Sequence, residues 1–348
     1  MSRQRIPFID FMKCLCIMLI VMFHIDHEFF NHLLPNLNNA LQAFRLPMYY
    51  FISGVFFKRY GGFTDFTRRK VNNILVPFCF FIVLAYGLRL AEFTVRWAVG
   101  AETIDISPVH LVEPFYLRYW DMTTPIWFLL SLFWCNIIYY AMQRWLKSLW
   151  LICLVALALS VIGYLCGIYH VLLPLMLDTS LVAIPYFILG HEVNRLGGVR
   201  PSRYDGWGTL VLLVVALPVY LLSENIHLLI QALPAYWKLY VLPFAAILAL
   251  FWTCRPLPYI PIFCHYGRYS LIILGTHTMI FEPLRFLLMH YGMSPGARLS
   301  LVVFVLTMLI EWPVIWLLKT WAPRFTAQEP FFYEGWKLHR PVLTTEKL

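Results

Sequence analysis

The chain has 348 residues, of which 61% are hydrophobic and only 13% are charged, and its formal net charge is +9. A soluble domain carries roughly 25% charged residues, so this composition excludes a soluble globular protein and indicates a polytopic membrane protein. The basic residues are spread over loops between apolar segments, so we expect lipid bilayer around the chain and no nucleic-acid partner.

Ten apolar runs of about 17 to 25 residues are long enough to cross a bilayer as α-helices. They cover residues 6–24, 40–57, 71–93, 124–142, 149–169, 179–195, 207–223, 236–253, 268–289 and 298–318. The fold class that we predict is therefore an all-α membrane helix bundle with about ten transmembrane helices. Basic residues concentrate in every second loop, so the positive-inside rule places both termini in the cytoplasm. We expect one transmembrane domain over residues 1–320 and a cytoplasmic tail over residues 321–348.

The first apolar segment contains three ionisable residues, Asp10, Lys13 and His24. At about 100° per residue, the eleven-residue step from Lys13 to His24 returns to nearly the same helix face, and Asp10 lies one turn before Lys13. The rise along the helix separates Lys13 from His24 by about 16 Å, so they line one path and do not touch. No small-residue cleavage pattern follows, and a secretory signal would exclude these charges, so we expect the segment to remain as a helix.

Possible metal ligands follow the first segment, but their pattern does not favour a metal site. Asp26, His27, Glu28 and His32 come directly after His24, at a membrane boundary where such residues are usually solvated. The eight cysteines lie in or beside apolar segments without a CxxC spacing, so we expect reduced core residues, neither disulfides nor zinc ligands. We predict no metal.

The second segment and the loop after it each allow two interpretations. Ser53 and Gly54 are small residues in an aromatic run, which predicts close helix packing or, alternatively, contact with a substrate. The loop over residues 58–70 is the most basic in the chain. Arg68, Arg69 and Lys70 at its end either fix the topology or form an anion site at the start of the third helix, where backbone N–H groups also favour phosphate.

Polar residues are few in the later segments. Trp127 opens the fourth segment, where we expect an anchor at the membrane interface. Ser270 and His277 share a helix face, but two turns separate them, so we expect packing polarity and no Ser/His nucleophile. Glu311 lies deep in the last segment, so its carboxyl group must be neutral, paired or in contact with water.

Five of these features, in this order, resemble the acyltransferase 3 family of ten-helix membrane acyltransferases. They are Asp10 and Lys13 followed by His24, Pro47 with Ser53 and Gly54, the basic stretch 66–77, the Ile-Trp-Phe-Leu sequence at 126–129, and Gly267 and Ser270 with His277. The likeness covers most of the chain. It departs from the family pattern at Lys13, where arginine is usual, and at Lys70 and Asn73, where two arginines often stand, so Arg68 or Arg69 takes over that role.

The resemblance implies transfer of an acyl group, usually acetyl, from cytoplasmic acyl-CoA to a hydroxyl of a saccharide or lipid-linked glycan. It further implies a multi-pass protein of a bacterial inner membrane that modifies cell-envelope polysaccharide. A near-neutral histidine can take the hydroxyl proton, so His24 would be the general base or, alternatively, a transient acyl carrier. Lys13 would steady the donor arm or the developing oxyanion, with Asp10 as its ion-pair partner.

The same resemblance assigns residues to the two substrates, acetyl-CoA being the expected donor. The donor-binding residues would be Arg68, Arg69, Lys70, Ser53, Gly54 and Arg268, and the acceptor pocket would contain Trp127, Ser270, His277 and Glu311.

Two other classes of membrane protein also place charges inside the bilayer. A transporter or flippase would show broken helices and an inverted repeat, and the sequence reveals neither. A glycan polymerase would show paired acids or arginines in a large outer loop. The longest loop, over residues 94–123, carries acids but no convincing pair.

Overall fold

The computed structural model describes residues 6–332, apart from 99, 101–103, 117, 119–124, 201, 203, 227 and 229–232. Several features of the sequence predictions lie outside the described residues. These are Arg3, Arg5, Arg203, part of the loop 94–123, the first residue of segment 124–142, and residues 333–348 of the tail.

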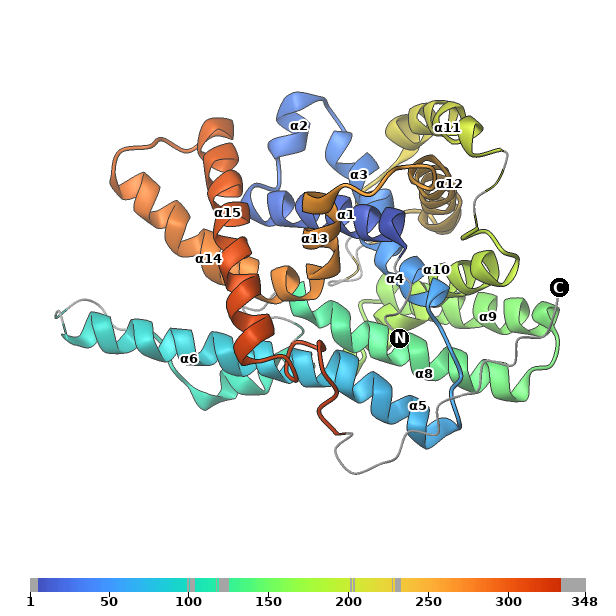
Figure 1. The fold of residues 1–348 in the computed structure, drawn as a ribbon, viewed down its shortest axis with the longest axis horizontal. Coiled ribbons are helices and arrows are strands. Elements are labelled where there is room, and N and C mark those ends of the chain that lie inside the picture. The colour runs from blue at the N-terminus through green and yellow to red at the C-terminus, as the bar shows by residue number, and fades with distance from the viewer. Residues whose placement is uncertain are drawn as a thin grey trace.

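Between its loops, the described part of the chain forms helices and no strands (Figure 1). Its α-helices are α1 (Pro7–Ile25), α2 (Phe29–Leu33), α3 (Leu37–Arg45), α4 (Pro47–Val55), α5 (Phe63–Lys70), α6 (Val76–Ala98), α7 (Glu113–Tyr116), α8 (Trp127–Trp145), α9 (Leu149–Ile168), α10 (Leu177–Arg195), α11 (Gly208–Leu222), α12 (Tyr236–Cys254), α13 (Pro261–Arg268), α14 (Ser270–His290) and α15 (Ala297–Trp321). This confirms the all-α prediction.

Eight helices among the described residues are long and apolar enough to cross a membrane, where the sequence predicts ten. The other two predicted segments are α8 and the pair α3–α4. α8 has 19 residues but carries Asn136, Gln143 and Arg144, which lower its hydropathy. A multi-pass membrane protein is thus confirmed, while the count of ten and the cytoplasmic position of the termini stay predictions.

The second predicted segment is broken inside the bundle. α3 ends at Arg45 and α4 begins at Pro47, with Leu46 between them. Proline lacks an N–H group and disfavours a helical conformation in the residue before it, but it fits the first turn of a new helix. The break is a discontinuity that the sequence analysis did not detect, and it leaves Arg45 at a helix end in the interior.

The basic cluster does not stand at a helix start, contrary to the sequence prediction. α5 begins at Phe63 and runs through a π-helical turn, Val71–Leu75, directly into α6. Pro77 removes one helical hydrogen bond and crowds the turn before it, which accounts for the wider π turn. Arg68, Arg69 and Lys70 therefore lie at the end of α5, and a helix N-terminus adds nothing to their attraction for phosphate.

The close approach predicted at Gly54 is present between α4 and α10. A Cβ atom on Gly54 would lie 1.9 Å from the Phe187 carbonyl oxygen, and one on Gly190 would lie 1.9 Å from the Phe51 carbonyl oxygen. Only glycine allows two helix backbones to meet this closely. The packing interpretation therefore accounts for Gly54, which α10 covers.

α1 occupies the middle of the bundle, in contact with α3, α4, α12, α13, α14 and α15 (Figure 1). Its partner α13 comes closest at Gly267, where a Cβ atom would lie 1.7 Å from the Asp10 carbonyl oxygen. Helices distant in sequence thus converge on the segment that carries Lys13 and His24. All eight cysteines are free, as expected, although Cys79 and Cys153 are exposed and do not belong to the core.

In the described part of the loop 94–123, two acids contact one histidine. The His110 ring contacts Glu113 at 2.6 Å through Nδ1 and Asp105 at 3.1 Å through Nε2. These hydrogen bonds raise the pKa of His110 above its usual value, with Glu113 the larger influence. Next along the chain, Arg118 forms a buried 2.6 Å ion pair with Asp178 at the start of α10. The loop is thereby fastened to the bundle.

The first residues of the predicted tail also pack against the bundle. The Phe325 ring stacks on Phe80 of α6, with centroids 5.4 Å apart. The Phe332 backbone N–H donates a 3.2 Å hydrogen bond to Asn72 in the π-helical turn. Residues 322–332 thus cover the junction between α5 and α6.

Candidate active site

Two histidines that are 253 residues apart meet in the bundle. The Nε2 atom of His277, on α14, lies 3.3 Å from Nδ1 of His24, near the end of α1. The two ring centroids are 5.2 Å apart. The sequence analysis singled out both residues but assigned them to separate roles, so this pairing is new.

The backbone fixes the proton positions on both rings. His24 Nδ1 lies 2.9 Å from the Ile20 carbonyl oxygen, and His277 Nδ1 lies 2.6 Å from that of Ile273. A carbonyl oxygen only accepts hydrogen bonds, so both Nδ1 atoms carry protons. The His24 N–H is then shared between the Ile20 oxygen and His277 Nε2. The Nε2 lone pair of neutral His24 is left free to accept a proton.

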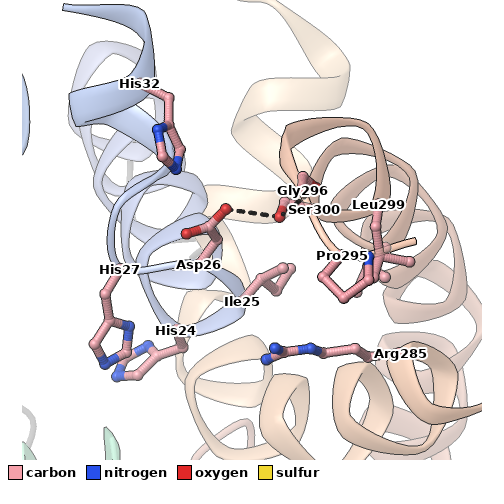
Figure 2. Close-up of a pocket in the computed structure, with 11 residues that line it drawn as sticks. His24, Ile25, Asp26, His27, His32, Arg285, Pro295, Gly296, Leu299 and Ser300 are labelled. Carbon is pink, nitrogen blue, oxygen red and sulfur yellow. Dashed lines mark hydrogen bonds between the residues drawn. The ribbon is translucent and has the colours of Figure 1, made fainter. Parts of the chain in front are cut away.

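The two histidines differ in their access to solvent. His277 is fully buried, whereas His24 is partly exposed and lines a cavity of about 470 Å³. The polar residues around this cavity are His24, Asp26, His27 and His32 from the α1–α2 region, and Arg285 and Ser300 from α14 and α15 (Figure 2). His24 therefore stands between a buried partner and an accessible space.

The cavity walls offer both charge and hydrogen-bonding groups. The Ser300 hydroxyl donates a 2.7 Å hydrogen bond to Asp26. In Figure 2, Arg285 reaches into the cavity opposite the imidazoles of His24 and His27. Within the described ranges, no group of three or more His, Cys, Asp or Glu side chains is arranged to hold a metal ion.

Arg45 is a residue of this region that the sequence analysis missed. Its guanidinium lies 3.8 Å from the ring centroid of Phe23, the residue before His24. Its Nη1 donates a 3.2 Å hydrogen bond to Asn38 Oδ1, and the residue is only 6% exposed. The available signal was an arginine inside the apolar run 40–57, the same kind of signal that revealed Lys13.

Lys13 lies toward the opposite end of α1. Its Nζ is 5.6 Å from the Phe56 ring, just beyond the end of α4. The Tyr49 hydroxyl donates a 2.9 Å hydrogen bond to the Lys13 carbonyl oxygen, and Ser270 interacts with the same hydroxyl. Ser270 therefore belongs to the Lys13 end, and His277 bonds to Ile273 and His24. The side chains of Ser270 and His277 thus have different partners, and an Asp10–Lys13 ion pair stays a prediction.

Two predicted pocket residues are buried in the core. Trp127 is only 7% exposed and packs beside Phe128, so the interfacial-anchor interpretation is wrong. Glu311 is fully buried, and its carboxyl oxygens lie 2.8 and 3.0 Å from the Thr276 hydroxyl, one residue before His277. Glu311 is thus hydrogen-bonded to α14 in the turn that carries His277.

Among the predicted donor-binding residues, Gly54 is buried against α10, and three of the basic residues contact neighbouring side chains. Arg69 contacts both carboxylate oxygens of Asp65 at 3.1 Å, and its guanidinium lies 4.5 Å from the Tyr60 ring. Lys70 lies over Phe66, and Arg268 lies 4.9 Å from the centroid of the Tyr269 ring. A donor phosphate that binds Arg69 would have to share it with Asp65.

These features define a multi-pass membrane protein with a histidine pair held inside its helical bundle beside a cavity. The chain belongs to the acyltransferase 3 family, since the family's acyltransferase domain matches residues 6–317. It is therefore a membrane acyltransferase, and the transporter and polymerase alternatives lose their support. No curated protein and no solved structure matches the chain.

Proposed function

We propose that this enzyme transfers an acetyl group from cytoplasmic acetyl-CoA to a hydroxyl of a saccharide or lipid-linked glycan, with His24 as the general base. The observation that carries the proposal is that His24 Nδ1 contacts both the Ile20 carbonyl oxygen and His277, which leaves Nε2 as the basic nitrogen of a ring that lines a cavity. The membrane would be a bacterial inner membrane, with both termini in the cytoplasm and cell-envelope polysaccharide as the product.

In the proposed reaction, His24 Nε2 removes the proton of the acceptor hydroxyl as its oxygen attacks the thioester carbonyl carbon. The π electrons move to the carbonyl oxygen and form a tetrahedral intermediate. Its collapse breaks the carbon–sulfur bond, and the proton on His24 passes to the departing CoA sulfur. The products are the acetyl ester and CoA, and His24 returns to its neutral form.

His277 supports this cycle by orienting the base. Its Nε2 accepts the His24 Nδ1–H, so it holds the ring in the tautomer that keeps Nε2 free. When His24 becomes positively charged, the same hydrogen bond strengthens because its donor is then ionised. In many enzymes a carboxylate orients the catalytic base. In this pair, the neutral imidazole of His277 takes the place of that carboxylate.

The two substrates would reach the reaction from opposite ends of α1. Lys13 lies near Phe56, just before the basic loop, where acetyl-CoA would enter and where Lys13 would steady the donor arm. The cavity beside His24 would hold the acceptor, since Asp26, Ser300 and Arg285 can bond to sugar hydroxyls. The separation of about 16 Å between Lys13 and His24 would suit an extended donor.

The first test follows release of the CoA thiol by the purified protein in lipid nanodiscs. We expect acetyl-CoA cleavage to depend on an added envelope glycolipid extract, with [¹⁴C]acetyl recovered as an alkali-labile ester. A strain without the gene should lose one acetyl ester from its surface glycan, as measured by NMR. An unchanged glycan, together with no CoA release in any extract, would rule out this function.

A second prediction concerns the donor site. Changing Arg68 and Lys70 to glutamine should raise the KM for acetyl-CoA by about 10²- to 10⁴-fold, because two charge-assisted hydrogen bonds are lost and each contributes about 1.5–3 kcal/mol. The matched control changes Arg144, in the last turn of α8, and Lys147, just after that helix, on the predicted cytoplasmic side. Poor membrane insertion with an unaltered KM in the inserted fraction would instead assign the cluster to topology alone.

A further inference from the structure

Arg45 is a buried cation whose hydrogen-bonding partner is neutral. Its Nη1 donates to the Asn38 amide oxygen, and no Asp or Glu of the described residues forms an ion pair with it. The two carboxylates that follow Phe23 along the chain have other hydrogen-bond donors, since Asp26 accepts from Ser300 and Glu28 accepts from Asn31. Charged side chains at this depth are normally paired, because desolvation of a charge is costly. An unpaired guanidinium in the interior can therefore stabilise a negative charge that develops on a bound substrate.

This cation is placed beside the proposed base. The guanidinium stacks on Phe23, and the centroid of the Phe23 ring lies 5.7 Å from that of the His24 ring. α3, which ends at Arg45, packs against α1, so the guanidinium lies against α1 near the His24 end of the stretch between Lys13 and His24. A thioester that travels from the Lys13 end to His24 would pass along this stretch.

Lys13 cannot take the oxyanion role at His24. The reacting carbonyl must lie about 3–3.5 Å from the hydroxyl that His24 deprotonates, and Lys13 is about 16 Å away along α1. The Lys13 Nζ atom lies 5.6 Å from the ring of Phe56, just beyond the end of α4. If Lys13 serves the donor arm, the negative charge that develops on the thioester oxygen needs another donor.

We propose that Arg45 is that donor: its guanidinium N–H groups bind the thioester carbonyl oxygen as the tetrahedral intermediate forms next to His24. This inference rests on the proposed function and adds a catalytic residue to it. While the acceptor oxygen forms its bond to carbon, the carbonyl π electrons move to oxygen, and Arg45 bears that charge until the carbon–sulfur bond breaks. Because a carboxylate does not already neutralise Arg45, its full charge is available to the transition state.

The position of the guanidinium is fixed before the substrate arrives. Phe23 supports one face and Asn38 holds Nη1. Asn38 is itself held, since its backbone N–H donates a 3.1 Å hydrogen bond to Asn31. The break between α3 and α4 places Arg45 at a helix end, from which its side chain reaches α1. Such preorganisation is what makes an oxyanion donor effective.

In a purely structural role, Arg45 would only hold α3 against Phe23. Three variants distinguish this role from the catalytic one. Arg45→Met keeps most of the packing and removes the donors, so we expect kcat to fall by about 10²- to 10³-fold, with the acetyl-CoA KM and the melting temperature almost unchanged. Arg45→Lys should retain part of the activity. Arg45→Ala should regain activity in millimolar guanidinium chloride, which replaces the missing group.

The matched control is Arg96→Met, which removes an exposed arginine paired with Glu92 and should leave kcat unchanged. If Arg45→Met keeps kcat within about threefold of the parent, or if activity and melting temperature fall together without guanidinium rescue, the oxyanion role is wrong. Failure of the proposed function is a separate result, since it would show as absent CoA release in the parent protein.

Discussion

His24→Ala should lower kcat for acetyl transfer by about 10²- to 10⁴-fold, the usual contribution of a positioned general base. The effect should be larger than that of His277→Ala, because His277 orients the base and does not itself touch the hydroxyl. Loss of the hydrogen bond between His277 and His24 should lower kcat by about tenfold. The measurement is CoA thiol release at saturating acetyl-CoA, in protein whose insertion and melting temperature match those of the parent.

The control for this prediction is His290→Ala, which removes an exposed histidine from the helix that carries His277. It should leave kcat unchanged. Rapid quenching with [¹⁴C]acetyl-CoA separates the base from the acyl-carrier alternative, since only a carrier forms labelled protein before the acceptor is added. Full activity of His24→Ala would contradict both assignments and would leave the histidine pair without a role in the chemistry.

Gly190→Ala should destabilise the bundle more than other small substitutions, because the new methyl group meets the Phe51 carbonyl oxygen at 1.9 Å. Backbone atoms cannot rotate away, so α4 and α10 must separate. Overpacking typically costs about 1–3 kcal/mol, and a clash with backbone belongs at or above the upper end of that range. We expect a melting temperature several degrees lower in detergent, measured by the loss of monodisperse protein after heating.

Gly54→Ala supplies an internal check on that explanation. It would clash with the Phe187 carbonyl oxygen across the same contact, so one separation of the helices relieves both substitutions. The double variant should therefore lose less stability than the sum of the two single variants. Gly87→Ala on α6 is the control, since a Cβ atom there meets nothing within 4 Å. Equal losses at Gly87 and Gly190 would contradict the close-packing explanation.

Predictions from local sequence patterns succeeded where the physical cause is local. The 61% hydrophobic composition predicted a membrane protein, and apolar run lengths predicted most of the long helices. The eleven-residue spacing of Lys13 and His24 placed both on α1, because helical periodicity depends only on neighbouring residues. The family resemblance was confirmed by the match over residues 6–317.

Predictions that depended on the surroundings of a residue were less successful. Trp127 was expected at the membrane interface but is buried, because helix faces that pack together were not distinguishable from faces in contact with lipid. The basic cluster was expected at a helix start, but α5 begins at Phe63 and carries the cluster in its last turn. Arg45 was passed over, because the break after it was not recognised at Pro47.

By itself, the sequence determined that this chain is a membrane-embedded helical protein, that Lys13 and His24 share one helix at a distance of about 16 Å, and that its motifs are those of an acyltransferase. The tertiary structure alone decided which residues meet: His24 with His277, Arg45 with Phe23, and the cavity that His24 lines. The reason is that helix periodicity is set within a few residues, whereas contacts between α1, α3 and α14 depend on how whole helices pack.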